Sequence, residues 1–240
     1  MTFAVNVDPR SDLGAPDPEM LFNVKFRGIR HTSFNIDRVK EYGSTCQRTG
    51  LKTLAIITGE SGGFVWDDTY TPDIIQIGNE PDAQSTYMTP TAYADMYVLF
   101  RTVYPDFKVF GAGLASGGEN ALNYWREVTQ RIMHRAPLPD AIAIHPYVKN
   151  HIEAAADFDM MWNEFQIPII ATEWYVDPQT NDMWDFVCML NNPEDGRSTL
   201  WNSWFCWTDA MEGPFGLVDK EGIPKPEHDS LLSAPCLNEV

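Results

Sequence analysis

The sequence predicts an α/β fold, a small (β/α)8 barrel of the TIM type, from three observations. Eight short apolar runs rich in β-branched residues recur about every 28 residues, a spacing that suits the strand–helix units of such a barrel. The runs are almost continuously hydrophobic, which is typical of strands buried on both faces of a parallel sheet. The chain has 240 residues, close to the length of one barrel, so we expect a single domain over residues 1–240.

The expected strands are, in chain order, Phe3–Val7, Val24–His31, Leu54–Thr58, Ile74–Asn79, Lys108–Leu114, Ala141–Tyr147, Pro168–Glu173 and Leu200–Trp207.

Helical segments alternate with these strands. Thr89 and Pro90 predict the start of a helix over Thr91–Val103, because Thr caps helix N-termini and Pro is tolerated in the first turn. Further helical spacing covers Asn35–Arg48, Asn120–Arg135, Ile152–Phe165 and Asn181–Leu190. The interval between Thr58 and Asp73 is too rich in Gly and Pro for a full helix, so we expect the third helix to be reduced or missing. An open doubly wound sheet is the alternative arrangement.

The composition is strongly acidic, which restricts the partners. Lys and Arg number 17 against 34 Asp and Glu, a formal charge of −17. Nucleic acid and anionic membranes are therefore disfavoured, and no run approaches the roughly 18 apolar residues of a membrane span. The N-terminus lacks the basic start and apolar stretch of a signal peptide, which leaves the localisation open. We expect a monomer that binds neither nucleic acid nor membranes.

Two glutamates directly follow apolar strand cores. Glu80 comes directly after the run IIQIGN, and Glu173 comes directly after the run IPIIAT. Catalytic groups of a barrel lie at the C-terminal ends of its strands, and a carboxylate is costly to bury there unless it is paired or used. A single glutamate of this kind can be a salt-bridge partner or a loop residue. Two of them, on the expected fourth and seventh strands, favour a catalytic pair.

Paired carboxylates suit glycoside hydrolysis. One carboxylic acid protonates the leaving oxygen, and one carboxylate faces the anomeric carbon. The nucleophilic carboxylate needs hydrogen-bond donors and positive charge that keep it ionised. Arg30, at the end of the second strand, and Tyr147 can supply these to Glu173. Asn79 can hold a sugar hydroxyl beside the cleaved bond.

Four motifs in chain order resemble the retaining glycoside hydrolases of clan A. They are IGNEPD (77–82), AIHPY (143–147), IATEW (170–174) and WFCWTD (204–209). Any one of them is weak alone, but together they match the order and strand placement of the clan along most of the chain. The compact length and IGNEPD are similar to small β-1,3-glucanases and to xylosidase-like members alike.

The resemblance implies a role for each matching residue. Glu80, preceded by Asn79, corresponds to the acid/base that closes strand four, and Glu173 to the nucleophile that closes strand seven. The remaining substrate-binding correspondences are the strand-two Arg30, the strand-six His145 and Tyr147, and the strand-eight Trp207.

These features together predict a retaining hydrolase of β-glycosidic bonds in a neutral carbohydrate such as a β-glucan, mannan or xylan. Short strand–helix connections are expected to leave an open groove, which favours internal cleavage of a polysaccharide. Trp174 and Trp207, beside the catalytic strand ends, are expected to stack on sugar rings. Trp66, in the Gly-rich segment after the third strand, is equally suited to stacking and to capping the core.

Two other functions stay open at this stage. A carbohydrate-binding barrel without turnover would keep Tyr147 and the tryptophans, although the presence of both glutamates counts against it. His31 and His145 could join the glutamates in a metal-dependent hydrolase, but no HxH or HExxH spacing accompanies them, and we expect no metal and no cofactor. The four cysteines lie far apart without a CxxC pair, so we expect thiols rather than a disulfide framework or zinc site.

Overall fold

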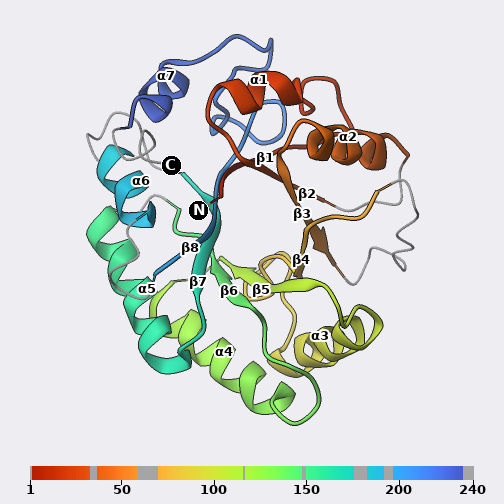
Figure 1. Cartoon of the computed structure of the whole chain (residues 1–240). Helices are drawn as coiled ribbons and strands as arrows, with labels where there is room; N and C mark the ends of the chain where they lie inside the picture. Colours follow the sequence, from red (N-terminus) through yellow and green to blue (C-terminus); the bar gives the residue numbers. More distant parts are fainter. Residues whose placement is uncertain are drawn as a thin grey trace.

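The computed structural model of the chain is a barrel surrounded by helices (Figure 1). It describes residues 2–32, 37–58, 70–115, 117–147, 150–175, 183–191 and 197–234. Eight parallel strands close into a ring in the order in which they occur in the sequence. The predicted (β/α)8 barrel is thereby confirmed, and the open doubly wound sheet is excluded because the last strand pairs with the first.

The strands are short and largely buried. Their bounds are β1 Phe3–Asn6, β2 Gly28–Thr32, β3 Lys52–Ile57, β4 Ile74–Ile77, β5 Lys108–Leu114, β6 Ala141–Ile144, β7 Ile169–Trp174 and β8 Arg197–Trp204.

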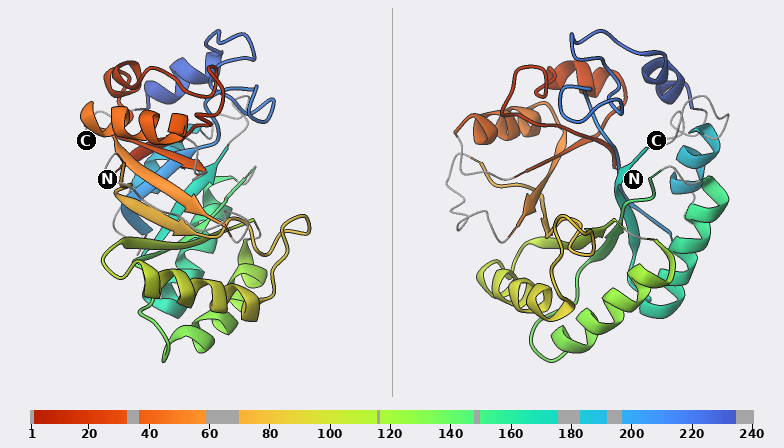
Figure 2. Two further views of the ribbon diagram at one scale, coloured as in Figure 1. Left: turned by 90° about the vertical axis from the view of Figure 1, so that its right-hand side faces the viewer. Right: turned by 180° about the vertical axis from the view of Figure 1, so that it is seen from behind.

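The helices form an outer layer around the strands (Figure 2). Their bounds are α1 Pro18–Asn23, α2 Asp37–Arg48, α3 Pro90–Val103, α4 Gly118–Ile132, α5 His151–Phe165, α6 Met183–Asn191 and α7 Pro226–Leu232. At α3 the Thr89 side chain accepts a hydrogen bond from the backbone N–H of Ala92 at 3.2 Å, which confirms the predicted cap. None of the helices in the described part of the chain has the length and apolar character needed to cross a bilayer.

The second strand begins four residues later than predicted. Residues Pro18–Asn23 form the short helix α1, which the sequence reading did not include, and the Asp17 side chain caps it by accepting a hydrogen bond from the backbone N–H of Glu19. Lys25 then has a positive φ of 73°, which turns the chain into the barrel. The prediction of a reduced or missing third helix concerns residues 59–69, which lie outside the described part of the chain.

Two hydrophobic clusters build the core, one on each side of the strand layer. Along β1, Ala4 belongs to one cluster, whereas its neighbours Phe3 and Val5 belong to the other. This alternation is the ordinary period of a strand. The smaller cluster includes Leu54, Phe110, Ile170 and Trp201. The larger cluster joins the strands to buried helix residues such as Trp125 of α4 and Phe186 of α6.

The expectation that all four cysteines are thiols is wrong for Cys188 and its bonding partner. Cys46 and Cys206 are free and buried, but Cys188 of α6 is disulfide-bonded. Its bonding partner lies outside the described residues.

Gly111 in β5 allows α4 to pack closely on the barrel. A Cβ atom built at this position would overlap the six-membered ring of Trp125, which is fully buried and packs edge-on against Tyr93 with 5.8 Å between ring centroids. We expect Gly111→Ala to lower the free energy of unfolding by about 1–3 kcal/mol, because the indole must move out of a filled core.

Urea denaturation of Gly111→Ala, Trp125→Phe and the double variant checks this expectation. The smaller ring of Phe leaves room for the methyl group, so the double variant should lose less stability than the two single losses combined. Strictly additive losses would show that Gly111 does not set the approach of α4.

Candidate active site

The C-terminal mouth of the barrel holds a cavity of about 470 Å³. Its walls come from the ends of seven strands and the segments that follow them: Asn6, Val7, Asp8, Arg10, Arg30, His31, Ile56, Asn79, Glu80, Tyr147, Glu173, Phe205, Met211, Glu212 and Phe215. The cavity therefore contains both glutamates that follow apolar strand cores.

Glu173 points into this cavity because the strand alternation breaks in β7. Ala171 and Trp174 both belong to the larger core cluster although they are three residues apart, and the register between β7 and β8 shifts between them. Such irregularities re-aim side chains at sheet rims. Glu173 thus faces the mouth, whereas Trp174, the next residue, faces the helix layer.

Glu173 is buried, and its carboxylate is fully paired. The Arg30 Nη1 atom donates a hydrogen bond to Glu173 Oε1 at 2.5 Å, and the Tyr147 hydroxyl donates to Oε2. Burial by itself raises the pKa of Glu173, but the electrostatic interactions with His145 and Arg30 and the hydrogen bonds from Tyr147 and Arg30 lower the pKa below its ordinary value of 4.5. Glu173 is therefore held as a carboxylate at neutral pH.

Arg30 of β2 is positioned by polar side chains of β1, of β4 and of the residues that follow β4. Its guanidinium donates to Asn6 Oδ1 at 2.9 Å, to Gln76 Oε1 at 3.1 Å and to Asn79 Oδ1 at 2.6 Å. Asn6 in turn donates to the backbone carbonyls of Thr172 and Trp204 at 3.1 and 3.2 Å. A buried guanidinium needs partners for its donors, and these contacts fix its direction toward Glu173.

Tyr147 remains a hydroxyl donor. Burial, together with the nearby charge of Glu173 and the hydrogen bond to it, raises the pKa of the phenol well above its ordinary value of 10.

Glu80 occupies a different environment from Glu173. Gly78, two residues before Glu80, has a φ of 83°. Glu80 itself has a positive φ of 46°, in a region that non-glycine residues rarely adopt. The side chain of Glu80 is 24% exposed, against 7% for Glu173. Its Oε1 atom lies 2.8 Å from Nδ1 of His145. The Glu80 carboxyl group is thus reachable from solvent, and among the residues that the structure describes it is anchored through Oε1.

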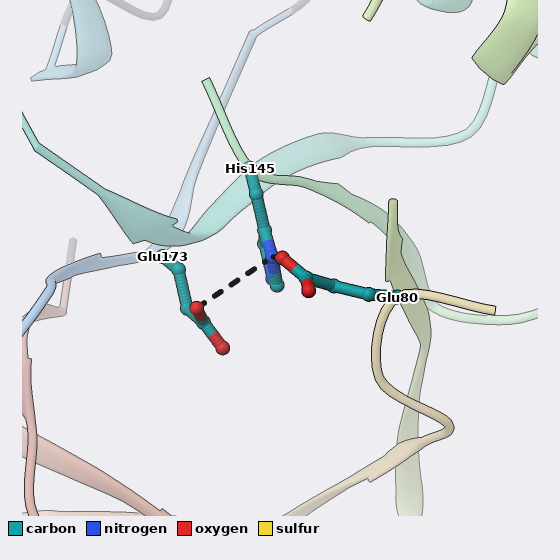
Figure 3. Close-up of side chains that lie close together, drawn as sticks. All are labelled: Glu80, His145 and Glu173. Atoms are coloured by element: carbon teal, nitrogen blue, oxygen red, sulfur yellow. Dashed lines mark hydrogen bonds and ion pairs between the residues drawn. The ribbon is translucent and has the colours of Figure 1, made fainter. Parts of the chain in front are cut away.

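His145 of the β6 end lies between the two glutamates (Figure 3). Its Nδ1 atom is 3.7 Å from Glu173 Oε2, and its Nε2 atom is 3.2 Å from Thr172 Oγ1. The ring packs against Gly113 of β5, where a Cβ atom would overlap it. Gly113 therefore provides the space for the imidazole behind Glu80.

The two carboxylates face each other at short range. Carboxylate oxygens of Glu80 and Glu173 and a ring nitrogen of His145 all lie within 4.8 Å of one another. Three such atoms can in principle hold a metal ion. Here the Arg30 guanidinium already lies against the Glu173 oxygen, and a second cation at that oxygen would be repelled. The donor set therefore fits a metal ion poorly.

The sequence matches no family profile and no curated protein. The fold is similar to that of solved GH128 structures. A GH128 (subgroup I) endo-β-1,3-glucanase from Amycolatopsis mediterranei, in complex with laminarihexaose, has a TM-score of 0.72 at 16% identity over 97% of this chain and 99% of that one. A GH128 (subgroup V) exo-β-1,3-glucanase from Cryptococcus neoformans has a TM-score of 0.66 at 18% identity over 98% and 99%.

A solved structure described as an oligosaccharide-binding protein also resembles this chain. A GH128 (subgroup VII) oligosaccharide-binding protein from Cryptococcus neoformans has a TM-score of 0.65 at 12% identity, with 100% of this chain and 94% of that one covered. At sequence identities of 12–18% these similarities show a shared barrel fold and no more.

The structure brings most of the predicted site residues together. Arg30, Asn79, Glu80, Tyr147 and Glu173 line the cavity, and His145 lies directly behind Glu80.

The two predicted stacking residues do not line the cavity. Trp174 is fully buried and stacks on Phe186 of α6 with 5.1 Å between ring centroids. Trp207 is 6% exposed and packs edge-on against His228 near α7. Sugar stacking by either residue is therefore not supported, because both indoles fill the layer between barrel and helices. Trp66 lies outside the described residues.

Several residues that line the cavity were not predicted from the sequence. Phe205, Met211 and Phe215 supply the apolar surface that the tryptophans were expected to provide. Asn6 and Gln76 hold Arg30, and their signal was available in the sequence, because each is a polar residue inside an otherwise apolar strand. Asp8 and Arg10 follow the first strand without any such pattern.

The lowered pKa of Glu173 predicts a specific pH dependence of stability. A carboxylate with a lowered pKa stabilises the folded state fully above its ordinary pKa of 4.5, and this contribution is lost as the pH falls through the folded-state value. Relative to Glu173→Gln, the wild-type protein should therefore lose unfolding free energy below pH 4.5. The loss is roughly 1.4 kcal/mol for each pH unit by which the pKa is lowered.

Urea denaturation of both proteins between neutral and acidic pH measures this difference. Other carboxylates titrate in both proteins and cancel in the comparison. A wild-type protein that gains stability relative to Glu173→Gln on acidification would show that burial dominates and that Glu173 is protonated in the folded state.

Proposed function

We propose that this protein is a retaining β-glycosidase that hydrolyses β-1,3-glucan, with Glu80 as the acid/base and Glu173 as the nucleophile. The observation that carries the proposal is the unequal environment of two facing carboxylates. Glu173 is buried, paired with Arg30 and lowered in pKa. Glu80 is partly exposed, and within the described part of the chain its carboxylate is held by His145 on one oxygen. Unequal environments are what separate the two roles in glycoside hydrolysis.

The distance between the carboxylates supports retention. Retaining pairs are about 5–5.5 Å apart, whereas inverting pairs need about 6.5–9.5 Å to admit a water molecule. One carboxylate oxygen of Glu80 and one of Glu173 lie within 4.8 Å of each other, a separation that supports the retaining rather than the inverting arrangement.

In the proposed first step, a Glu173 oxygen attacks the anomeric carbon while the bond from that carbon to the glycosidic oxygen breaks. Glu80 gives its proton to the departing oxygen. In the second step Glu80 takes a proton from water, the water oxygen bonds to the anomeric carbon, and the Glu173 ester bond breaks. Arg30 and Tyr147 hold the Glu173 oxygens in position throughout, and they stabilise the carboxylate when it is released.

The choice of β-1,3-glucan rests on the neighbours of the fold. Solved structures of these neighbours include complexes with laminarihexaose and laminaritriose. A neutral glucan also suits a chain with a formal charge of −17, which would repel a polyanion. Mannan and xylan remain the other substrates that the sequence admits.

Binding without turnover is the second candidate function. The oligosaccharide-binding neighbour shows that the fold supports it. The presence of both carboxylates at short range favours catalysis, because a binding site has no need of a carboxylate held ionised beside a second carboxyl group.

A substrate panel tests the proposal. We expect reducing sugar to be released from laminarin and laminari-oligosaccharides, with little release from cello-, manno- or xylo-oligosaccharides. The predicted internal cleavage should produce oligosaccharides early and glucose late. Treatment with a chelator should leave the rate unchanged. Retention of laminari-oligosaccharides without any release of sugar would favour the binding function instead.

Replacement of the acid/base should depend on the leaving group. Glu80→Gln keeps the shape of the side chain but cannot give a proton, so hydrolysis of laminari-oligosaccharides should fall on the order of 10²–10⁴-fold. Aryl glycosides with activated leaving groups need little protonation and should lose less in the glycosylation step. Steady-state and pre-steady-state rates on both substrate types measure the difference, and equal losses would remove Glu80 from this role.

Replacement of the nucleophile should be rescued by a small anion. Glu173→Gly should be almost inactive on laminari-oligosaccharides, whereas added azide should enter the vacated space and yield the α-glycosyl azide from an activated substrate. Proton NMR of the wild-type reaction should show the β-anomer as the first product. An α-anomer formed first would mean inversion and would exclude Glu173 as the nucleophile.

A further inference from the structure

The cavity extends unevenly around the catalytic pair. Among the described residues, it is lined on the side of β4 by Asn79 and Glu80. On the side of β8 and β1 it is lined by residues of two segments that rise above the barrel, the β1–α1 segment and the segment after β8. These segments are neighbours, since the backbone N–H of Trp207 donates to the Asn6 carbonyl at 3.0 Å.

This asymmetry gives a bound glucan a direction, if the proposed function holds. Glu80 must touch the glycosidic oxygen, so the leaving part of the chain begins on the β4 side. Glu173 must lie at the anomeric carbon of the reacting sugar. The rest of the glycone then extends away from Glu80. In a ring of eight strands, β8 lies opposite β4, so the glycone enters the walled part of the cavity.

One wall of that part is polar. The Arg10 Nε and Nη2 atoms donate to the two oxygens of Asp8, each at 2.7 Å, so the pair is bidentate and has a fixed plane. Asp8 is held by its own backbone, whose N–H donates to the Gly14 carbonyl at 2.9 Å. An ion pair as exposed as this contributes little to stability, yet it lines the cavity. Arg10 and Asp8 offer donors and acceptors in the arrangement that sugar hydroxyls use.

The other wall is formed by residues 205–219, here called the strap, and its cavity-lining residues are apolar except for Glu212. Phe205, Met211 and Phe215 of the strap are half-buried and line the cavity. Phe205 lies edge-on to Tyr147 with 5.7 Å between ring centroids, which joins the apolar wall to the catalytic centre.

The strap is held in place by an ion pair and by hydrogen bonds to its backbone. Lys225 Nζ lies 3.1 Å from Asp209 Oδ1 and donates to the Pro214 carbonyl at 2.8 Å, and the backbone N–H of Gly216 donates to Asp209 Oδ1 at 2.7 Å. Its apolar side chains are therefore presented as a formed surface, on which the C–H face of a pyranose ring can pack.

We propose that Arg10 and Asp8, opposed by Met211 and Phe215, form a binding subsite for the second glycone sugar, the one adjoining the reacting sugar on its non-reducing side. This inference rests on the proposed function. Asn6, at the end of β1, contacts Arg30 beneath the reacting sugar. Asp8 and Arg10 lie farther along the same segment, toward the rim. They therefore contact the next ring and set the preference for a glycone of two or more glucosyl residues.

The test compares two activated substrates that differ by one glycone sugar, para-nitrophenyl β-glucoside and para-nitrophenyl β-laminaribioside. Arg10→Ala removes the donors of the polar wall. We expect the ratio of kcat/KM for the laminaribioside to kcat/KM for the glucoside to fall about tenfold, the effect of losing a hydrogen bond to a charged group.

Arg38→Ala is the matched control. Arg38 forms an ion pair with Asp12 of the same β1–α1 segment, is 47% exposed in its side chain against 48% for Arg10, and does not line the cavity. The substrate ratio should be that of the wild type in this variant, and the melting temperatures of both variants should lie near the wild-type value.

The possible outcomes are distinct. A fall in the ratio for Arg10→Ala but not for Arg38→Ala supports the subsite. An unchanged ratio, or an equal change in both variants, overturns it while the proposed function stands. A wild-type protein that cleaves neither glycoside but does cleave another β-linked substrate overturns the subsite together with the choice of β-1,3-glucan.

Discussion

The ion pair between Arg30 and Glu173 is the interaction on which the rest of the mouth depends. A buried charge pair is stable only if every remaining donor and acceptor finds a partner. The barrel meets this requirement with Asn6 of β1, Gln76 of β4 and Asn79 at the end of β4. Polar residues therefore interrupt apolar strands on the inner face of the barrel near the mouth. These hydrogen bonds offset the cost of burying the ion pair. They also fix the orientation of the Arg30 guanidinium, which orients the Glu173 carboxylate and keeps it ionised.

The second carboxylate is governed by backbone geometry rather than by charge. Gly78 and Glu80 both have positive φ, and the Glu80 side chain is turned toward His145, which in turn needs the space left by Gly113. Glu80 and Glu173, which face each other across the cavity, thus differ in environment for different physical reasons. One is surrounded by donors, and the other is placed by a strained turn and left open to solvent, which is the division of labour that acid/base and nucleophilic catalysis require.

The sequence predicted the fold and most of the polar residues that line the cavity, but not how they are arranged. Continuous apolar runs located the eight strands, and polar residues at their ends indicated Arg30, Asn79, Glu80, Tyr147 and Glu173. Trp174 was misplaced because a break in alternation, which no local pattern marks, turns adjacent residues to opposite sides of the strand. Asn6 and Gln76, which accept hydrogen bonds from Arg30, were missed because contacts between strands depend on their register. The apolar strap was missed because its position follows from tertiary contacts such as that of Lys225 with Asp209.

Closure of the ring between β1 and β8 has a consequence for the order of assembly. Asn6 orients Arg30 while its own amide donates to carbonyls of Thr172 and Trp204, residues from the far end of the chain. During synthesis the mouth cannot form until the last strand has left the ribosome, because the buried guanidinium lacks its anchor before then. Ring closure and charge burial are therefore one event, a contact between distant parts of the sequence of the kind that slows folding. A nascent or truncated chain that lacks β8 has no such mouth.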